Sequence, residues 1–381
     1  MICFCLTLTT QKPASSASMT KIDPLAVLSN LKAWQLKHLA FLTGLNSTGT
    51  KAQVCRTLVD RSNKPGLSAS PCRILSVDMG VKNLAFCLLE TRRVQGDEQT
   101  TDGTLSMHLS DWKRMDVSER LLARHTNPST ACSSPTSGES TGEPGELNET
   151  SSDDPTNIYA PSSLCKIAFV LATEFLQYKP DYILIERQRF RSGGAPAIQE
   201  WTVRVNMLES MLWASLETMR HHNRTQQDQD QKFPEILEMS PRRVGMFWLT
   251  RGDFFPTPAD IAASLMAPQE TIKAVETEVK KKSFEKKDKI ALARHWLSLS
   301  LTTDDLTVDD NLAPMVASFC APKERQSRRR SKDDEHDEEP EVKDTPAISG
   351  KLDDLADCLV QAVTFALWEQ NRERVREYVK S

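Results

Sequence analysis

Residues 74–80 read ILSVDMG, so a short, mainly apolar run ends at Asp78, with Gly80 two residues further on. A run of this length predicts a buried β-strand. The same arrangement recurs at residues 182–187, YILIER, where Glu186 follows the apolar run. A third acidic segment, LDDLAD at residues 352–357, opens an amphipathic C-terminal helix. Carboxylates therefore stand at the ends of three separate, partly buried elements.

Charges at the ends of buried elements are costly unless something neutralises them. Divalent metal ions can do so, and carboxylates that bridge two such ions are suited to phosphodiester hydrolysis. On the C-terminal helix, Asp354 and Asp357 are spaced i, i+3, whereas Asp353 and Asp357 are spaced i, i+4. Either pair presents its oxygens from one helix face. These acids predict a metal-dependent nuclease.

Each acid alone has a simpler interpretation. Asp78 could be a turn residue before Gly80, and Asp353 or Asp354 could only cap the last helix. Glu186 could form a surface ion pair with the neighbouring Arg187. The occurrence of acids at all three element ends favours a shared site.

The order of the predicted elements is typical of an RNase H-like fold. That fold carries an Asp on its first strand, a Glu on its fourth strand and further acids on a late helix. We therefore predict an α/β protein with an RNase H-like mixed sheet flanked by helices. The expected strands are 74–77, 83–89, 105–115, 182–186 and 234–239, and the expected helices are 162–178, 196–221 and 280–299.

The charge distribution is compatible with a nucleic-acid partner, although the 381-residue chain has a net charge of −4. Residues 126–157 carry six acids and no Lys or Arg, and residues 322–349 carry nine acids against seven bases. Both segments are predicted to be disordered inserts, and without them the rest of the chain has a net charge of +4. The nine cysteines lack the spacing of a zinc site or disulfide framework. No apolar run is long enough to cross a bilayer.

Residues 22–63 predict a small helical module. The string from Leu36 to Leu58, with Gly44 and the STGTK turn at residues 47–51, resembles the SAP motif, a helix-extended-helix DNA-binding module. This resemblance implies that Lys37 and Lys51 lie near DNA phosphate. A solvated helical hairpin is the alternative. Residues 1–21 are a possible transit segment, and Met19 an alternative start.

Three motifs together resemble the fungal mitochondrial Holliday junction resolvases, relatives of the bacterial RuvC-type enzymes. They are DMGVKNLA at 78–85, IERQRFR at 185–191 and DDLADCL at 353–359. The resemblance implies one catalytic domain over residues 72–378. The two long inserts of this chain, at residues 126–157 and 322–349, depart from the family pattern.

The resemblance further implies a mitochondrial endonuclease that makes symmetric nicks in four-way DNA junctions. Its ligands for two Mg²⁺ ions, or Mn²⁺, would be Asp78, Glu186, Asp357 and one or both of Asp353 and Asp354. Symmetric nicks call for a homodimer, and the helix at 196–221 offers a candidate surface, although burial in the core is the better explanation for most of its apolar residues. Neither a membrane nor a small-molecule substrate is expected.

Several basic and aromatic residues are candidate DNA contacts. Arg189 and Arg191 follow the catalytic Glu186 and can hold phosphates, while Phe190 could stack on an unpaired base. Residues 280–289 contain six lysines and two acids. The remaining candidates are Arg243, Lys286 and Lys287. Two rival functions remain, an RNase H-type nuclease on RNA–DNA hybrids and a non-catalytic SAP-domain DNA-binding scaffold.

Overall fold

The computed structural model describes residues 23–64, 66–67, 71–94, 104–117, 157–188, 200–225, 232–251, 265, 268–270, 282–300, 306–321 and 352–380. Both acidic inserts, apart from Asn157, and the N-terminal 22 residues lie outside this part of the chain. Among the described helices, none combines the length and hydropathy needed to span a membrane.

A six-stranded mixed sheet forms the centre of the fold, with the strand order β5-β4-β1-β2-β3-β6. The strands β1, β2 and β3 form an antiparallel meander, whereas β4 and β5 extend the sheet in parallel beside β1. This meander followed by parallel strands is the RNase H-like topology predicted from the sequence. The strands are β1 (Cys72–Asp78), β2 (Leu84–Val94), β3 (Thr104–Met115), β4 (Tyr182–Glu186), β5 (Glu235–Met239) and β6 (Leu306–Val308).

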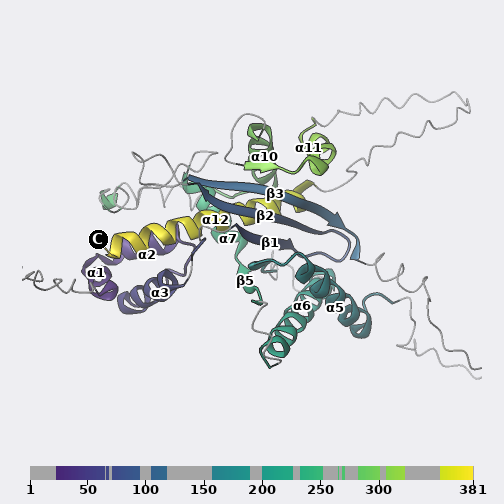
Figure 1. Cartoon of the computed structure of the whole chain (residues 1–381), viewed down its shortest axis with the longest axis horizontal. Helices are drawn as coiled ribbons and strands as arrows, with labels where there is room; N and C mark the ends of the chain where they lie inside the picture. Colours follow the sequence, from purple (N-terminus) through teal and green to yellow (C-terminus); the bar gives the residue numbers. More distant parts are fainter. Residues whose placement is uncertain are drawn as a thin grey trace, which may run out of the picture.

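Helices cover both faces of the sheet (Figure 1). On β1, Leu75 and Val77 pack towards α5 and α6, whereas Ile74 belongs to the core around α12. Side chains alternate along a strand, so every second residue of β1 faces α12. The helices beside the sheet are α5 (Pro161–Gln177), α6 (Glu200–Thr225), α7 (Pro241–Arg251), α10 (Lys286–Leu299), α11 (Ala313–Cys320) and α12 (Leu352–Lys380), with a 3₁₀ turn, η1 (Asp310–Leu312).

The N-terminal helices α1 (Pro24–Asn30), α2 (Ala33–Leu42) and α3 (Lys51–Asn63) pack on the C-terminal half of α12 (Figure 1). Their apolar core includes Val375 and Val379 of α12. The carbonyl groups at the ends of α2 and α3 have no partner within their own helix. Side chains of α12 and α7 donate to these carbonyls: Asn371 to Leu42 (2.8 Å), Arg372 to Thr43 (3.2 Å), Arg243 to Gly44 (2.9 Å), and Arg376 to Ser62 and Lys64.

Gly44 ends α2 with a Schellman motif, in which Leu45 N–H donates to Ala40 O at 2.7 Å and Gly44 N–H to Phe41 O at 3.1 Å. Its φ of +66° is left-handed, where glycine is favoured. A Cβ atom at this position would lie 2.1 Å from the Trp368 ring of α12. The glycine therefore permits both the turn and the close contact with α12.

We expect Gly44→Ala to destabilise the protein by roughly 2–4 kcal/mol, because the new methyl group would strain the left-handed backbone and also clash with the Trp368 ring. Chemical denaturation of the full-length protein measures this loss. A second variant, Trp368→Leu, removes the ring that the new methyl group meets. The double variant should therefore lose less than the sum of the two single losses, and strict additivity would contradict the proposed clash.

Candidate metal centre

Strand alternation brings two of the predicted acids to the α12 face of the sheet. Asp78 is the last residue of β1 and Glu186 the last residue of β4. The two strands are parallel neighbours, with Val77 opposite Ile185. Their carboxyl ends therefore lie at the same edge, where α12 places Asp357 in its second turn.

The carboxylates of Asp78, Glu186 and Asp357 form one cluster, in which one oxygen from each lies within 4.8 Å of the others. Burial, followed by the charges of Glu186, Asp357 and Asp354, raises the pKa of Asp78 well above its usual value. Burial also raises the pKa of Asp357, although nearby Lys289 opposes that change. Like charges held this close favour a bound cation.

The two remaining acids of α12 have different surroundings. Asp353 is buried and forms an ion pair with Lys286 of α10. Asp354 is close enough for its charge to raise the pKa of Asp78. Both acids lie in the first turn of α12, where the helix dipole favours negative charge. Of these two acids, Asp354 acts on Asp78 through its charge, whereas Asp353 contacts α10 and acts on Asp357.

Lys289 is a member of the site that the sequence did not indicate. Its ammonium group forms an ion pair with Asp357, and its side chain is only 17% exposed. Burial alone would lower the pKa of Lys289, but the charges of Asp357 and Glu186 raise it above its usual value. The lysine-rich start of this helix was the available signal, although the sequence interpretation selected Lys286 and Lys287 for DNA contact.

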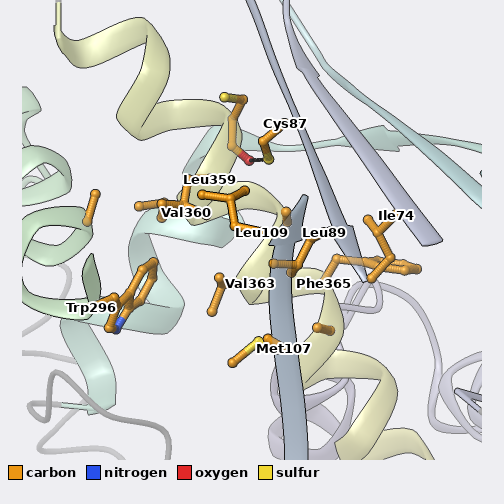
Figure 2. Packing of buried hydrophobic residues seen from close by; sticks show 14 of the residues in the cluster. Ile74, Cys87, Leu89, Met107, Leu109, Trp296, Leu359, Val360, Val363 and Phe365 are labelled. Carbon is orange, nitrogen blue, oxygen red and sulfur yellow. Dashed lines mark hydrogen bonds between the residues drawn. The ribbon is translucent and has the colours of Figure 1, made fainter. Parts of the chain in front are cut away.

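Hydrogen bonds from neighbouring strands hold the acidic turns of α12 against the sheet. Trp112 of β3 donates its indole N–H to Leu355 O at 3.0 Å. Cys87 of β2 contacts Cys358 O through its thiol at 3.3 Å, as Figure 2 shows among the surrounding apolar side chains. These two carbonyls flank Asp357 in the chain, so the position of its carboxylate depends on packing from β2 and β3.

The other predicted contact residues are distributed over separate surfaces. Lys37 and Lys51 are exposed on α2 and α3. Lys287 is exposed and forms an ion pair with Glu285 at 3.0 Å. Arg243 donates to Gly44 O and thus contacts the helical module. The segment from Arg189 through Phe190 to Arg191 lies outside the described residues.

The simpler interpretations of Asp78 and Glu186 receive no support from this geometry. Asp78 and Glu186 contribute to one cluster, and Arg187 forms an ion pair with Glu238 of β5 at 3.0 Å.

A cluster whose ligand atoms are all carboxylate oxygens suits a hard divalent cation such as Mg²⁺ or Mn²⁺. An RNase H-like sheet with such a cluster defines a class, the metal-dependent enzymes that hydrolyse phosphodiesters.

Sequence comparison then identifies the family within that class. The family model described as "Mitochondrial resolvase Ydc2 / RNA splicing MRS1" matches residues 74–375, and the chain belongs to this family. The resemblance noted from the three motifs is therefore confirmed.

Two relatives are both named "Cruciform cutting endonuclease 1, mitochondrial". The protein of Schizosaccharomyces pombe is 30% identical over 224 residues, which cover 58% of this chain and 68% of the relative. The protein of Saccharomyces cerevisiae is 23% identical over 380 residues, covering 96% of this chain and 91% of the relative. A crystal structure of the yeast mitochondrial Holliday junction resolvase Ydc2 aligns with a TM-score of 0.49 at 18% identity, covering 92% of this chain and 99% of that chain.

Proposed function

We propose that this protein is a mitochondrial Holliday junction resolvase, an endonuclease that nicks two strands of a four-way DNA junction. The observation that carries the proposal is the cluster of Asp78, Glu186 and Asp357 at the sheet edge, in a chain of the resolvase family. The relatives' names supply the substrate and the mitochondrial setting.

Asp78, Glu186, Asp357 and Asp354 are the residues that would hold Mg²⁺ or Mn²⁺. When bound, two such ions would activate water and stabilise the leaving oxygen of a phosphodiester. The protein itself holds the carboxylates in place through β1, β4 and α12. Lys289 supplies a positive charge beside Asp357, and the exposed Lys287 can contact DNA phosphate.

Paired nicks on two strands of like polarity require two active sites, which favours a homodimer. Helix α6 presents apolar side chains to solvent, including Trp201 at 50% and Val203 at 40% exposure. Met207 and Met211 line a groove on the same helix. Leu208, by contrast, is fully buried in the core. The exposed part of α6 is the surface we propose for the partner copy.

The rival from another class is a non-catalytic SAP-domain DNA-binding scaffold. A scaffold has no need for three carboxylates within 4.8 Å of one another, because their negative charges repel one another and also repel DNA phosphates. Retention of the cluster therefore favours catalysis. An RNase H-type nuclease would use the same cluster, and only its substrate would differ.

Purified full-length protein incubated with a labelled four-way junction, a matched linear duplex and an RNA–DNA hybrid separates these functions. We expect symmetric nicks in the junction alone, with Mg²⁺ or Mn²⁺ and not with EDTA, from a dimer in solution. Cleavage of the hybrid by a monomer would support the RNase H-type enzyme instead. Tight junction binding without cleavage in either metal would support the scaffold.

Lys289 and a metal ion would compete for Asp357, and this competition can be measured without DNA. We expect Lys289→Met to lower the Mn²⁺ concentration for half-maximal thermal stabilisation by roughly 3- to 10-fold, since a competing positive charge is removed. Lys287→Met is the matched control, because Lys287 is exposed and pairs with Glu285. A higher Mn²⁺ requirement in Lys289→Met would show that the lysine assists metal binding.

A further inference from the structure

Gln361 is a buried polar residue on α12, four positions after Asp357. Its side chain is only 3% exposed. Its neighbours in the chain, Val360 and Ala362, are also buried and belong to the apolar core between α12 and the sheet. A primary amide in such surroundings carries a desolvation cost unless it forms hydrogen bonds.

The Gln361 amide nitrogen contacts both strands that carry clustered acids. It donates to Ser76 Oγ at 3.0 Å, and it lies 3.4 Å from Val77 O and 3.5 Å from Leu184 O. Ser76 and Val77 immediately precede Asp78 on β1, and Leu184 lies two residues before Glu186 on β4. One side chain thus links α12, β1 and β4, which are the elements that carry the three acids.

This buried polar pair is difficult to explain by stability alone. Ser76 is fully buried, and an apolar pair of similar size at positions 76 and 361 would avoid desolvating a hydroxyl and an amide. Hydrogen bonds differ from apolar contacts in specifying distance and direction. What the pair adds is a defined register between α12 and the two strands.

We propose that Gln361 is a positioning residue that sets the spacing of Asp78, Glu186 and Asp357, and thereby the affinity of the centre for divalent metal ions. The effect of Gln361 on metal-dependent cleavage rests on the proposed function. Its effect on metal affinity rests only on the carboxylate cluster and the contacts of Gln361. Groups that hydrogen-bond directly to metal ligands change metal affinity or activity by about 10- to 100-fold when they are removed. Gln361 contacts the strand residues beside the ligands, so we expect an effect at the lower end of that range.

Thr364 provides a matched control on the same helix. Its side chain is fully buried, and its hydroxyl accepts a hydrogen bond from the Trp248 indole N–H at 2.8 Å. Trp248 belongs to α7, which carries none of the clustered acids. Loss of the Thr364 hydroxyl should therefore weaken helix packing without changing the spacing of the carboxylates.

The experiment titrates Mn²⁺ against the thermal unfolding midpoint of the full-length protein, without DNA, for the wild type, Gln361→Met and Thr364→Val. We expect Gln361→Met to need about 10-fold more Mn²⁺ for half-maximal stabilisation. Thr364→Val should unfold at a lower temperature in EDTA and keep the wild-type Mn²⁺ midpoint. Ser76→Ala, a smaller change, should shift the midpoint in the same direction as Gln361→Met.

An unchanged Mn²⁺ midpoint in both Gln361→Met and Ser76→Ala would overturn the proposal. Equal shifts in Gln361→Met and Thr364→Val would also overturn it, because general loosening would then explain them. If Gln361→Met fails to fold, Ser76→Ala decides alone. If the wild type binds Mn²⁺ but cuts no junction, the proposed function fails, while a selective midpoint shift still supports positioning by Gln361.

Discussion

Asn in place of Asp78 is expected to reduce cleavage of a four-way junction by roughly a thousandfold or more, a loss of about 4 kcal/mol in transition-state stabilisation. The reason is geometric, since Asp78 ends the central strand and lies within the cluster of Glu186 and Asp357. The amide keeps the size of the side chain but lacks its charge. Single-turnover cleavage with Mg²⁺ measures the loss, and a gel-shift assay in EDTA should show that junction binding persists.

A pair of variants on α12 controls for general damage to the acidic cluster. Asp354→Asn should reduce cleavage nearly as strongly as Asp78→Asn, because Asp354 lies close enough to influence Asp78. Asp353→Asn should reduce cleavage by less than about tenfold, because Asp353 pairs with Lys286 of α10 and is not one of the three clustered carboxylates. If Asp353→Asn caused the larger loss, the assignment of the fourth ligand would have to be reversed.

Much of the sheet could be predicted because its strands have strong local signals. Residues 74–77 and 182–185 are short, mainly apolar runs, and the structure places both in adjacent, buried parallel strands. Alternation along each strand then places Asp78 and Glu186 on one face. Asp78 and Glu186 were therefore accessible from their positions at the ends of these two runs.

Lys289 and Gln361 could not be identified in the same way, because their contacts depend on how distant elements pack. Lys289 meets Asp357 across 68 positions of the chain, and Gln361 meets Ser76 across 285. Nothing local distinguishes one glutamine in an amphipathic helix, or one lysine among six at a lysine-rich helix start. Only the packing of α12 against the strands and α10 distinguishes them from their neighbours.

The contacts of the helical module with α12 and α7 could not be identified from the sequence either. Gly44 belongs to the SAP-like string, and in the structure it ends α2 with a positive φ. Residue spacing gave no indication that Trp368 of α12 packs against it, or that Arg243 donates to its carbonyl. Because α12 also carries Asp357, one helix connects the module to the metal centre. A DNA arm bound by Lys37 and Lys51 would therefore be held in a defined orientation to the cluster.

The metal-free protein is expected to become more stable when Asp78 is replaced by Asn, opposite to the effect of that change on activity. Burial and the charges of Glu186 and Asp357 raise the pKa of Asp78 in the folded state above its unfolded value of about 3.9. The folded state therefore binds the proton more tightly than the unfolded state. Stability from this group is fully present below about pH 4 and is lost as pH rises through the folded pKa.

Thermal unfolding in EDTA between about pH 5 and about pH 8 tests this sign. The unfolding midpoint of Asp78→Asn should exceed that of the wild type. The difference should grow with pH until the pH passes the folded pKa of Asp78. Saturating Mn²⁺ should reverse the order, because metal at a hundred times its Kd stabilises the wild type by about 2.7 kcal/mol and the variant by less. Asp60→Asn, an exposed change on α3, controls for net charge. The opposite result would be a wild type that is more stable than Asp78→Asn in EDTA at every pH. It would mean that the protein already neutralises the clustered carboxylates, so that metal binding is not strengthened by their mutual repulsion.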